Sequence, residues 1–425
     1  MEPKLITRRA TLKGIAAMAT IQIIPSHILR AETAPSNQLT KGIIGCGTIS
    51  GSHLKMPGKL LALCDVDSKH LAAKMGQANK GGQNDVKGYE HFEELIARKD
   101  IDIVHIATPP HWHAYMAIAA AKAGKDIWCE KPMSRTIGEG IAMVKAVEEQ
   151  KRIFRLNTWF RFRSNYYGLG KPASEVWKVI HHKLLGDGPY TFTVAPALVW
   201  GWKLKMWAGR TDLKEQAIPA ELNYDKWLGP APLKPYHPHR VHNSFRGYWD
   251  YDGGGLGDMG QHFLDPCQFV LGKDSESPVS IEADTQAQHH DAVLPWRRIE
   301  MVYADGTKII LDTAADPKGE KPIITGPKGS IYRGFKSDVP DLDKKLKELS
   351  GPPPMITDFH QAVKARKKFA LNEQNGFRSC TLINMAKIAL RENRPLKFDS
   401  DKLQFINDEK ANAYLHPLAR GKYGV

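Results

Sequence analysis

Asp258, His262 and Asp265 follow one another at intervals of four and three residues within Gly253 to Asp265, whose sequence is GGGLGDMGQHFLD. Residues spaced in this way share one face of a helix, which we expect to begin near Leu256. An imidazole with an ordinary pKa of about 6.5 can take a proton from a hydroxyl group, and a carboxylate beside it can orient the ring. A surface ion pair has the same spacing. The glycines favour a site, because each one in a helix interior costs roughly 0.5–1 kcal/mol relative to alanine.

The glycines around this helix start are expected to let a ligand approach the backbone of the first turn. Pro266 lies four residues after His262, so it cannot donate to the histidine carbonyl and clashes with it. We therefore predict a kink or a break just after the histidine.

A second candidate site lies near the start of the chain, where Gly45-Cys46-Gly47-Thr48-Ile49-Ser50 follows a short apolar run. A G-x-G turn between a strand and a helix lets the backbone approach a pyrophosphate, and an acidic residue about 20 positions later binds the ribose hydroxyls. Asp65 has that position, at the end of the apolar run Leu60 to Cys64. It favours NAD over NADP, because a 2′-phosphate would meet a carboxylate.

Two further polar sequences follow predicted strands: Thr108-Pro109 comes after Ile101 to Ala107, and Glu130-Lys131 comes after Asp126 to Cys129. Open α/β sheets bind ligands at the edge where their parallel strands end. We therefore expect one dinucleotide site at this edge. Its candidate residues are Gly45, Gly47, Thr48, Ile49, Asp65, Thr108, Pro109, Glu130 and Lys131.

The elements that must position these residues alternate strand and helix from Leu39 to about Asn157, and the composition then changes. Eight of the ten tryptophans lie between Trp159 and Trp296. Tryptophan rings stack on sugars, but they also fill cores and interfaces. The candidate substrate contacts in this region are Trp200, Trp202 and Arg161, and Trp207 is the third tryptophan of interest.

The first 34 residues differ from the rest of the chain. Thr7-Arg8-Arg9-Ala10-Thr11-Leu12-Lys13 is a twin-arginine pattern, and the moderately apolar run Gly14 to Leu29 follows it. We interpret residues 1–34 as a twin-arginine (Tat) export signal and expect a periplasmic or exported protein; an amphipathic N-terminal helix is the alternative. No later stretch reaches 18 apolar residues, so the mature chain is expected to lack a membrane span.

The formal net charge of +14 could favour acidic partners. The basic residues are dispersed and no nucleic-acid motif occurs, so we expect a solvated basic surface and no nucleic-acid partner. The five cysteines show no CxxC spacing and lie mostly in apolar runs, which predicts buried thiols. Histidine pairs recur along the chain, but none has a zinc-binding spacing, so no metal site is expected.

Three motifs in order, Pro109 to His113 (PPHWH), Glu130-Lys131-Pro132 and the D-x-G-x-H-x-x-D element of Asp258 to Asp265, resemble those of the Gfo/Idh/MocA family. That family takes its name from glucose–fructose oxidoreductase, inositol dehydrogenase and a rhizopine catabolism protein, and the resemblance covers nearly the whole mature chain. It implies a Rossmann domain, residues 35–157, and an α/β domain, residues 158–425, with a large, mostly antiparallel sheet. The C-terminal helices are expected to pack back on the first domain.

By position in these motifs, Lys131, Asp258 and His262 match the catalytic lysine, aspartate and histidine of the family. His113 lies where the family often lines the nicotinamide pocket, although it also fits a helix start. The resemblance implies an NAD-dependent oxidoreductase, with NADP less expected, acting on a secondary hydroxyl of a sugar, glycoside or polyol. His262 would be the base, Asp258 would orient it, and Lys131 would stabilise the alkoxide.

An export signal of this type implies a protein that folds before transport and carries its cofactor outward. We expect that cofactor to be tightly held and recycled in place, since the periplasm offers no dependable supply. The second hypothesis is a redox-neutral glycosidase, in which a transient ketone at carbon 3 drives loss of the aglycone. The third is a non-catalytic sugar-binding protein, which the presence of all three family residues disfavours. A homo-oligomer is expected in each case.

Overall fold

The computed structural model describes residues 38–158, 160–162, 169–194, 207–314, 316 and 319–423. The expected export signal and the candidates Trp200 and Trp202 lie outside the described residues. Thr40–Val425 cluster as one compact unit, which holds both expected domains.

The first domain is built on a six-stranded parallel sheet with the order β3-β2-β1-β4-β5-β6. This is the strand order of dinucleotide-binding folds, so the expected Rossmann domain is confirmed. All four residues of β4 are buried, as the apolar run predicted for a strand covered on both faces. The strands are β1 (Thr40–Ile44), β2 (Lys59–Cys64), β3 (Lys87–Tyr89), β4 (Ile103–Ile106), β5 (Asp126–Glu130) and β6 (Phe154–Asn157).

Helices connect these strands and begin at recognisable caps. The Asp67 side chain accepts the backbone N–H groups of Lys69 and His70 at the start of the helix that follows β2, and Thr136 with Glu139 forms a capping box at the helix that follows β5. The helices are α3 (Ser50–Lys55), α4 (Ser68–Lys80), α5 (Phe92–Ile96), α6 (His113–Lys122), which follows the 3-10 turn η2 (Pro110–Trp112), and α7 (Ile137–Glu149).

The second domain contains an eight-stranded sheet with the order β12-β11-β7-β10-β9-β8-β13-β14. Every neighbouring pair is antiparallel except β7 and β10, which confirms the expected mostly antiparallel sheet. In β10 buried residues alternate with partly buried ones, as in a strand with one face on a core. The strands are β7 (Thr191–Val194), β8 (Ser280–Thr285), β9 (Trp296–Val302), β10 (Lys308–Asp312), β11 (Ile324–Gly326), β12 (Gly329–Ile331), β13 (Leu396–Asp399) and β14 (Gln404–Phe405).

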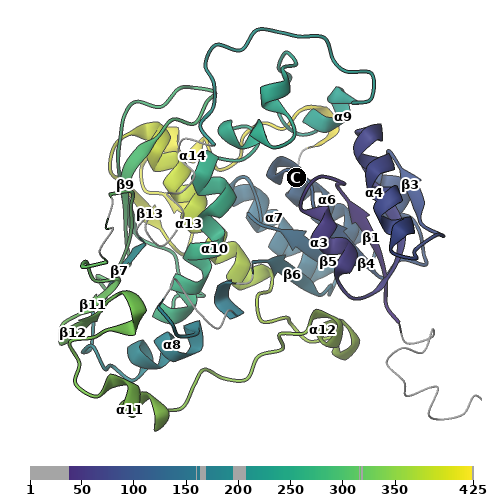
Figure 1. Ribbon diagram of the computed structural model, residues 1–425. Helices are drawn as coiled ribbons and strands as arrows, with labels where there is room; N and C mark the ends of the chain where they lie inside the picture. The colour runs from purple at the N-terminus through teal and green to yellow at the C-terminus, as the bar shows by residue number, and fades with distance from the viewer. Residues whose placement is uncertain are drawn as a thin grey trace, which may run out of the picture. The chain divides into compact units, whose positions relative to one another are not determined.

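Two long helices, α10 (Gly254–Leu271) and α13 (Glu373–Glu392), lie side by side in the second domain (Figure 1). Helix α13 also packs against α7 and β6 of the first domain, so the two domains share part of their core. The remaining described helices are α8 (Ala173–His181), α9 (Tyr224–Leu228), α11 (Leu342–Lys347), α12 (Phe359–Ala365) and α14 (Glu409–Asn412), with 3-10 turns η3 (Phe160–Phe162), η6 (Pro238–Arg240), η7 (Ser244–Gly247), η8 (Arg333–Phe335) and η9 (Gly421–Tyr423).

Helix α10 runs through Pro266 and ends at Leu271, so of the predicted kink or break after His262 the break is wrong. The helix packs against α8 and α13, and all but one of its residues are buried. Tertiary packing of this kind supplies most of the stability of a helix in a protein, and here it outweighs the roughly 3 kcal/mol that an internal proline costs.

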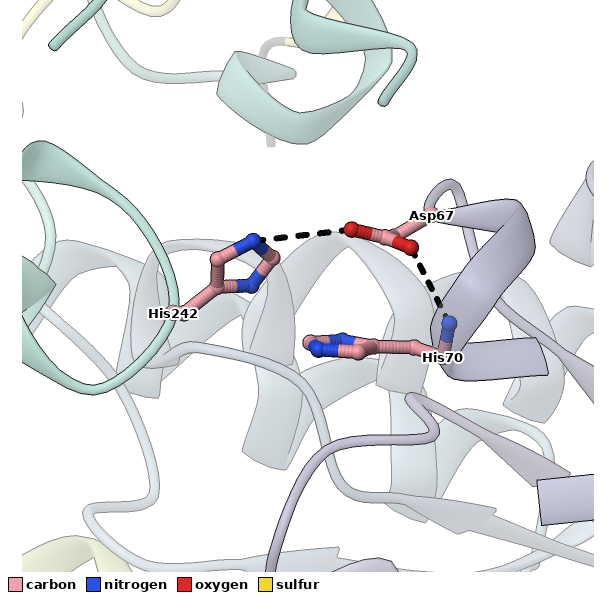
Figure 2. A group of neighbouring side chains, drawn as sticks. All are labelled: Asp67, His70 and His242. Carbon is pink, nitrogen blue, oxygen red and sulfur yellow. Dashed lines mark hydrogen bonds and ion pairs between the residues drawn. The ribbon is translucent and has the colours of Figure 1, made fainter. Parts of the chain in front are cut away.

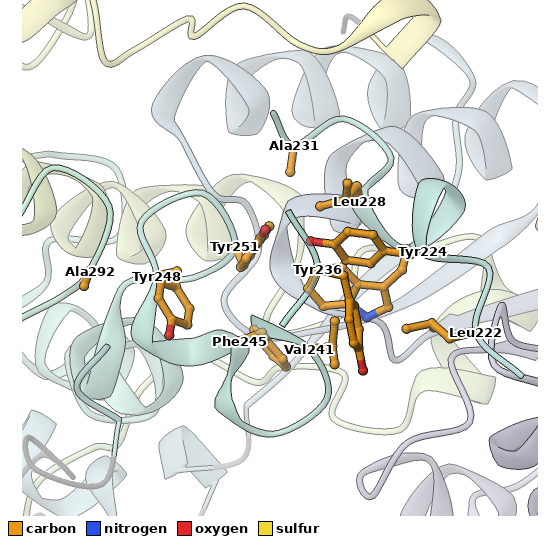
Figure 3. Packing of buried hydrophobic residues seen from close by; sticks show 11 residues of the cluster. Leu222, Tyr224, Leu228, Ala231, Tyr236, Val241, Phe245, Tyr248, Tyr251 and Ala292 are labelled. Carbon is orange, nitrogen blue, oxygen red and sulfur yellow. The ribbon is translucent and has the colours of Figure 1, made fainter. Parts of the chain in front are cut away.

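The segment before α10, residues 207–253 with α9 inside it, has a small core, made largely of aromatic rings (Figure 3). Tyr224, Tyr248 and Tyr251 are among its buried members. Backbone bonds join the segment to the first domain, from Asn223 N–H to the Val66 carbonyl at 2.9 Å and from Ser68 N–H to the Glu221 carbonyl at 2.9 Å. These bonds place the segment beside the carboxyl end of β2.

All five cysteines are buried free thiols, as the sequence predicted. Among the described residues, no helix combines the length and apolar character needed to cross a membrane.

Candidate active site

A cavity of about 470 Å³ lies at the carboxyl ends of β1, β2 and β4. Seven of the ten residues predicted to bind the dinucleotide line it: Gly45, Gly47, Thr48, Ile49, Asp65, Thr108 and Pro109. Residues from three strand ends therefore meet at one place, as the strand-end rule predicts.

The glycine turn leaves the backbone bare along this cavity. Gly45 has φ +94°, and a Cβ there would lie 2.6 Å from the Ala107 carbonyl oxygen, so only glycine lets β1 end so close to β4. A Cβ at Gly47 would meet no atom within 4 Å, which leaves open space beside the turn. A pyrophosphate group fits in such a space.

Asp65 supplies the carboxylate at the ribose position. Its oxygens accept the backbone N–H groups of Cys46 at 2.6 Å and Asp67 at 2.8 Å. Burial raises the pKa of Asp65 above its ordinary value, and the two backbone hydrogen bonds oppose that shift. The bare turn and this carboxylate together fit the pyrophosphate and ribose of NAD.

A second cavity adjoins the first and shares Thr48, Ile49 and Thr108 with it. The predicted catalytic residues Lys131, Asp258 and His262 all line this second cavity, as does Glu130. The structure thus brings together a lysine from the end of β5 and two residues from α10, more than a hundred positions apart in the sequence.

Lys131 is fixed by Asp258. Its ammonium donates to the Asp258 carbonyl oxygen at 2.5 Å and to carboxylate oxygen Oδ1 at 3.1 Å. The same carboxylate accepts Arg246 Nε at 2.8 Å and the indole N–H of Trp207 at 2.9 Å. Asp258 was expected to orient the histidine, whereas these contacts tie it to two cations and an indole.

His262 is held by residues that follow β6. Its Nδ1 lies 2.8 Å from Thr158 Oγ1, and its ring stacks on Phe160 with centroids 4.9 Å apart and planes at 18°. The imidazole is 4% exposed. Thr158 is therefore placed to orient the imidazole.

Sequence reasoning missed Thr158, Phe160 and Arg246, whereas Trp207, one of the tryptophans it singled out, lines the second cavity. Thr158 had a usable signal, because it follows a parallel strand just as Thr108 follows β4 and Lys131 follows β5. Trp207 and Arg246 belong to the segment before α10, which shows no motif and reaches the site through tertiary packing.

Glu130 lies in a buried network at the end of β5. Its Oε1 accepts Asn157 Nδ2 at 2.6 Å and lies 2.9 Å from His53 Nε2. Burial alone would raise the pKa of Glu130, but the contacts with His53, Lys131 and Asn157 outweigh it, and the pKa lies below its ordinary value. An ionised carboxylate therefore anchors the strand end that carries Lys131.

His113 does not line either cavity, in contrast to the nicotinamide-pocket role expected from the family. Its Nδ1 lies 2.7 Å from the Pro132 carbonyl oxygen and its Nε2 lies 2.9 Å from that of Thr108. Burial lowers the pKa of His113. A neutral imidazole carries one N–H, so the buried ring at the start of α6 donates to one of these two carbonyl oxygens.

Arg161 is not a substrate contact. Its guanidinium forms a bidentate pair with Asp265, at 2.9 and 2.8 Å, and a second pair with Asp274, at 2.6 and 2.8 Å. The side chain is 1% exposed, and it lines neither cavity. This buried arginine joins η3 to α10, and Asp265 belongs to that ion pair rather than to the site.

The glycines of the opening motif make room for a protein side chain. A Cβ at Gly257 would lie 2.0 Å from Asp252 Oδ1. Asp252 is buried and lines the second cavity, and burial together with the nearby Asp258 raises its pKa to about 7. The side chain for which Gly257 makes room is therefore that of Asp252.

Residues 39–158 match the model of the oxidoreductase family with the NAD-binding Rossmann fold, and residues 169–425 match that of its C-terminal α/β domain. The chain belongs to the Gfo/Idh/MocA oxidoreductase family. Its first domain is the NAD-binding domain of that family.

Two curated relatives of this Gfo/Idh/MocA protein have described activities. It is 31% identical over 159 residues to a glycosyl hydrolase family 109 protein of Solibacter usitatus, covering 35% of this chain and 36% of the relative. It is 28% identical over 138 residues to inositol 2-dehydrogenase of Salmonella typhimurium, covering 31% of this chain and 40% of the relative. The matches thus span two fifths or less of these relatives.

Among solved structures, the WlbA dehydrogenase of Bordetella pertussis, in complex with NADH and UDP-GlcNAcA, resembles the chain with a TM-score of 0.58. The alignment covers 85% of this chain and 98% of that one at 20% identity. This likeness shows that the two proteins share a fold.

Proposed function

We propose that this protein is an NAD-dependent oxidoreductase that oxidises a secondary hydroxyl of a sugar, glycoside or polyol. The observation that carries the proposal is the meeting of Lys131 and His262 in one cavity beside the dinucleotide cavity. Membership of the Gfo/Idh/MocA family and the similarity to an inositol 2-dehydrogenase support it.

His262 takes the hydroxyl proton in this proposal. A neutral imidazole accepts a proton at one nitrogen only when the other nitrogen carries hydrogen. With Nδ1–H donating to Thr158 Oγ1, Nε2 is the basic nitrogen for the substrate.

Lys131 stabilises the negative charge that develops on the substrate oxygen, because its ammonium is held in place before the substrate binds. Asp258 positions that ammonium. When bound, the nicotinamide of NAD accepts the hydrogen and two electrons that leave the carbinol carbon. Asp65 holds the adenosine ribose, and the turn at Gly45 and Gly47 holds the pyrophosphate.

We also propose that the cofactor is retained and recycled within the protein, which acts in the periplasm or outside the cell as a homo-oligomer. The support is the twin-arginine pattern at Arg8 and Arg9. A folded, cofactor-loaded protein exported in this way could oxidise one sugar and reduce another without a supply of fresh NAD.

The second candidate function is a redox-neutral glycosidase that works through a transient ketone. The similarity to a glycosyl hydrolase family 109 protein favours it. The same residues would serve, since oxidation of the carbinol is the first step in both reactions, and a ketone acidifies the neighbouring C–H bond.

Incubation of the purified, NAD-loaded protein with a panel of hexosides and polyols separates these functions. A stable keto-sugar with reduced cofactor supports the oxidoreductase. A free aglycone with no net change in the cofactor supports the glycosidase. If sugars bind but no member of the panel gives either product, only the hypothesis of a non-catalytic sugar-binding protein remains.

A further inference from the structure

A second group of chemically active side chains lies where the segment before α10 meets the first domain: Asp67, His70 and His242 (Figure 2). Asp67 and His70 come from the start of α4, and His242 comes from the loop between η6 and η7. One ligand atom of each lies within 4.8 Å of the other two. We propose that these three side chains bind a divalent transition-metal ion, with Zn²⁺ the best match.

The donor set determines the class of ion. Two imidazole nitrogens with one carboxylate oxygen suit zinc and its neighbours in the first transition row, whereas calcium and magnesium require mostly oxygen ligands. Three protein ligands leave one position of a zinc tetrahedron for water. His70 and His242 line the dinucleotide cavity, so that position would face the cavity.

The Asp67 carboxylate is held by the fold before any ion binds. Asp67 Oδ1 accepts the backbone N–H groups of Lys69 at 2.9 Å and His70 at 3.0 Å, which caps α4. The other oxygen, Oδ2, is the one near His242. His70 is three residues after Asp67, which places the two side chains on the same side of the helix start.

One pair of donor atoms, on His242 and Asp67, already lies close to the separation of two ligands on a shared ion. His242 Nε2 lies 3.5 Å from Asp67 Oδ2, beyond the usual N–H···O range of about 2.7–3.2 Å. Two atoms bound to one tetrahedral zinc at about 2.0–2.1 Å lie about 3.3–3.4 Å apart. The His70 and His242 rings have centroids 4.4 Å apart at 59°, and both rings are partly exposed, so rotation of these rings can close the remaining gap.

An ion at this position would link the two domains. The neighbouring contacts, from Ser68 to Glu221 and from Asn223 to Val66, already join α4 and the end of β2 to the segment before α10. The ion would add a bond across the same junction, close to Asp65. The proposed oxidoreductase needs no metal for its chemistry, so this site goes beyond that function and can be tested without a substrate.

The test measures Zn²⁺ binding by the full chain. The protein is treated with a chelator, dialysed and titrated with zinc chloride by calorimetry. We expect one equivalent to bind, and we expect His70→Gln and His242→Gln each to weaken that binding at least tenfold, which removal of one ligand from a three-ligand site predicts. The matched control is His290→Gln, since His290 is an exposed histidine on another loop, and it should leave the affinity unchanged.

X-ray absorption of the zinc-loaded protein gives the second measurement, which does not depend on variants that fold. The expected spectrum shows nitrogen and oxygen neighbours with the outer-shell signature of two imidazoles. Absence of a stoichiometric site, equal binding by both glutamine variants with native circular dichroism, or sulfur in the first shell would each overturn the proposal.

Discussion

The Lys131 ammonium donates to both the backbone carbonyl and the carboxylate of Asp258. Arg246 donates to the same carboxylate. A cation held in this way has its position set by α10 rather than by its own flexible stem. The carboxylate therefore positions the ammonium for the substrate oxygen, and a second cation keeps the carboxylate paired if the lysine is lost.

Lys131→Met should test this directly, because methionine keeps much of the side-chain length and removes the charge. We expect kcat to fall by about 10²–10³, the usual loss when one preorganised electrostatic donor is removed. The bound NAD, measured after denaturation, should not change. Lys145→Met, at a lysine that is 72% exposed, is the matched control. Unaltered kcat in Lys131→Met would rule out the electrostatic role.

Thr158 is expected to act through His262 as a positioning residue. Thr158→Val keeps the shape and removes Oγ1, so loss of a hydrogen bond worth about 1–1.5 kcal/mol should lower kcat about tenfold and shift the pH profile of kcat/KM. Thr158→Ser should restore both the rate and the profile. If serine and valine behave alike, the hydroxyl has no such role.

Asp252 should make stability depend on pH. Its folded pKa of about 7 lies above the unfolded value of about 3.9, so between these values the unfolded state releases the proton while the folded state keeps it. Stability contributed by the protonated form is therefore present below about pH 4 and is lost as pH rises toward about 7, by up to roughly 4 kcal/mol.

Asp252→Asn lacks this titration. Urea unfolding at about pH 5 and about pH 8 gives the free energy of unfolding of both proteins. The value for the variant, relative to the wild type, should be higher at about pH 8 than at about pH 5. A difference in free energy of unfolding that stays constant with pH would show that Asp252 is not a buried titrating acid.

At the scale of elements, α10 shows how much of the site the sequence determines. The spacing of Asp258 and His262 predicted that they share one face of this helix. The positions of Gly45, Asp65 and Thr108 after apolar runs predicted the strand-end loops that line the first cavity. The continuation of α10 through Pro266 could not be predicted, because the helix is stabilised by packing against α8 and α13, which are distant in the sequence.

The first turn of α10 depends on the absence of a side chain at Gly257. Gly257→Ala should destabilise the protein by about 1–3 kcal/mol, because the new methyl group would meet Asp252 Oδ1. The double variant with Asp252→Ala should lose less than the sum of the two single changes, since the clash is then gone. Additive losses in thermal or urea unfolding would place the cause elsewhere.

At the scale of the whole molecule, the site exists only where the two domains meet. Both domains line the dinucleotide cavity, and in the second cavity the first domain supplies Lys131 while the second supplies Asp258, His262, Trp207 and Arg246. Site residues of the second domain could be predicted where they belong to a motif, as His262 does. Arg246, and the trio of Asp67, His70 and His242, come together only through the packing of a segment without periodic pattern, so the sequence alone gave no spacing from which to find them.

The central claim is that a carbinol carbon in the second cavity gives up its hydrogen to the nicotinamide while Lys131 and His262 act on the oxygen. A substrate found in the hexoside and polyol panel, prepared with deuterium on each candidate carbinol carbon in turn, tests this most directly. The account predicts that one labelled position transfers deuterium to the protein-bound nicotinamide in a single turnover, detected by mass spectrometry, and that Lys131→Met slows the transfer. Turnover of the same substrate with all the deuterium retained on the sugar carbons, or exchanged only with water, would contradict it.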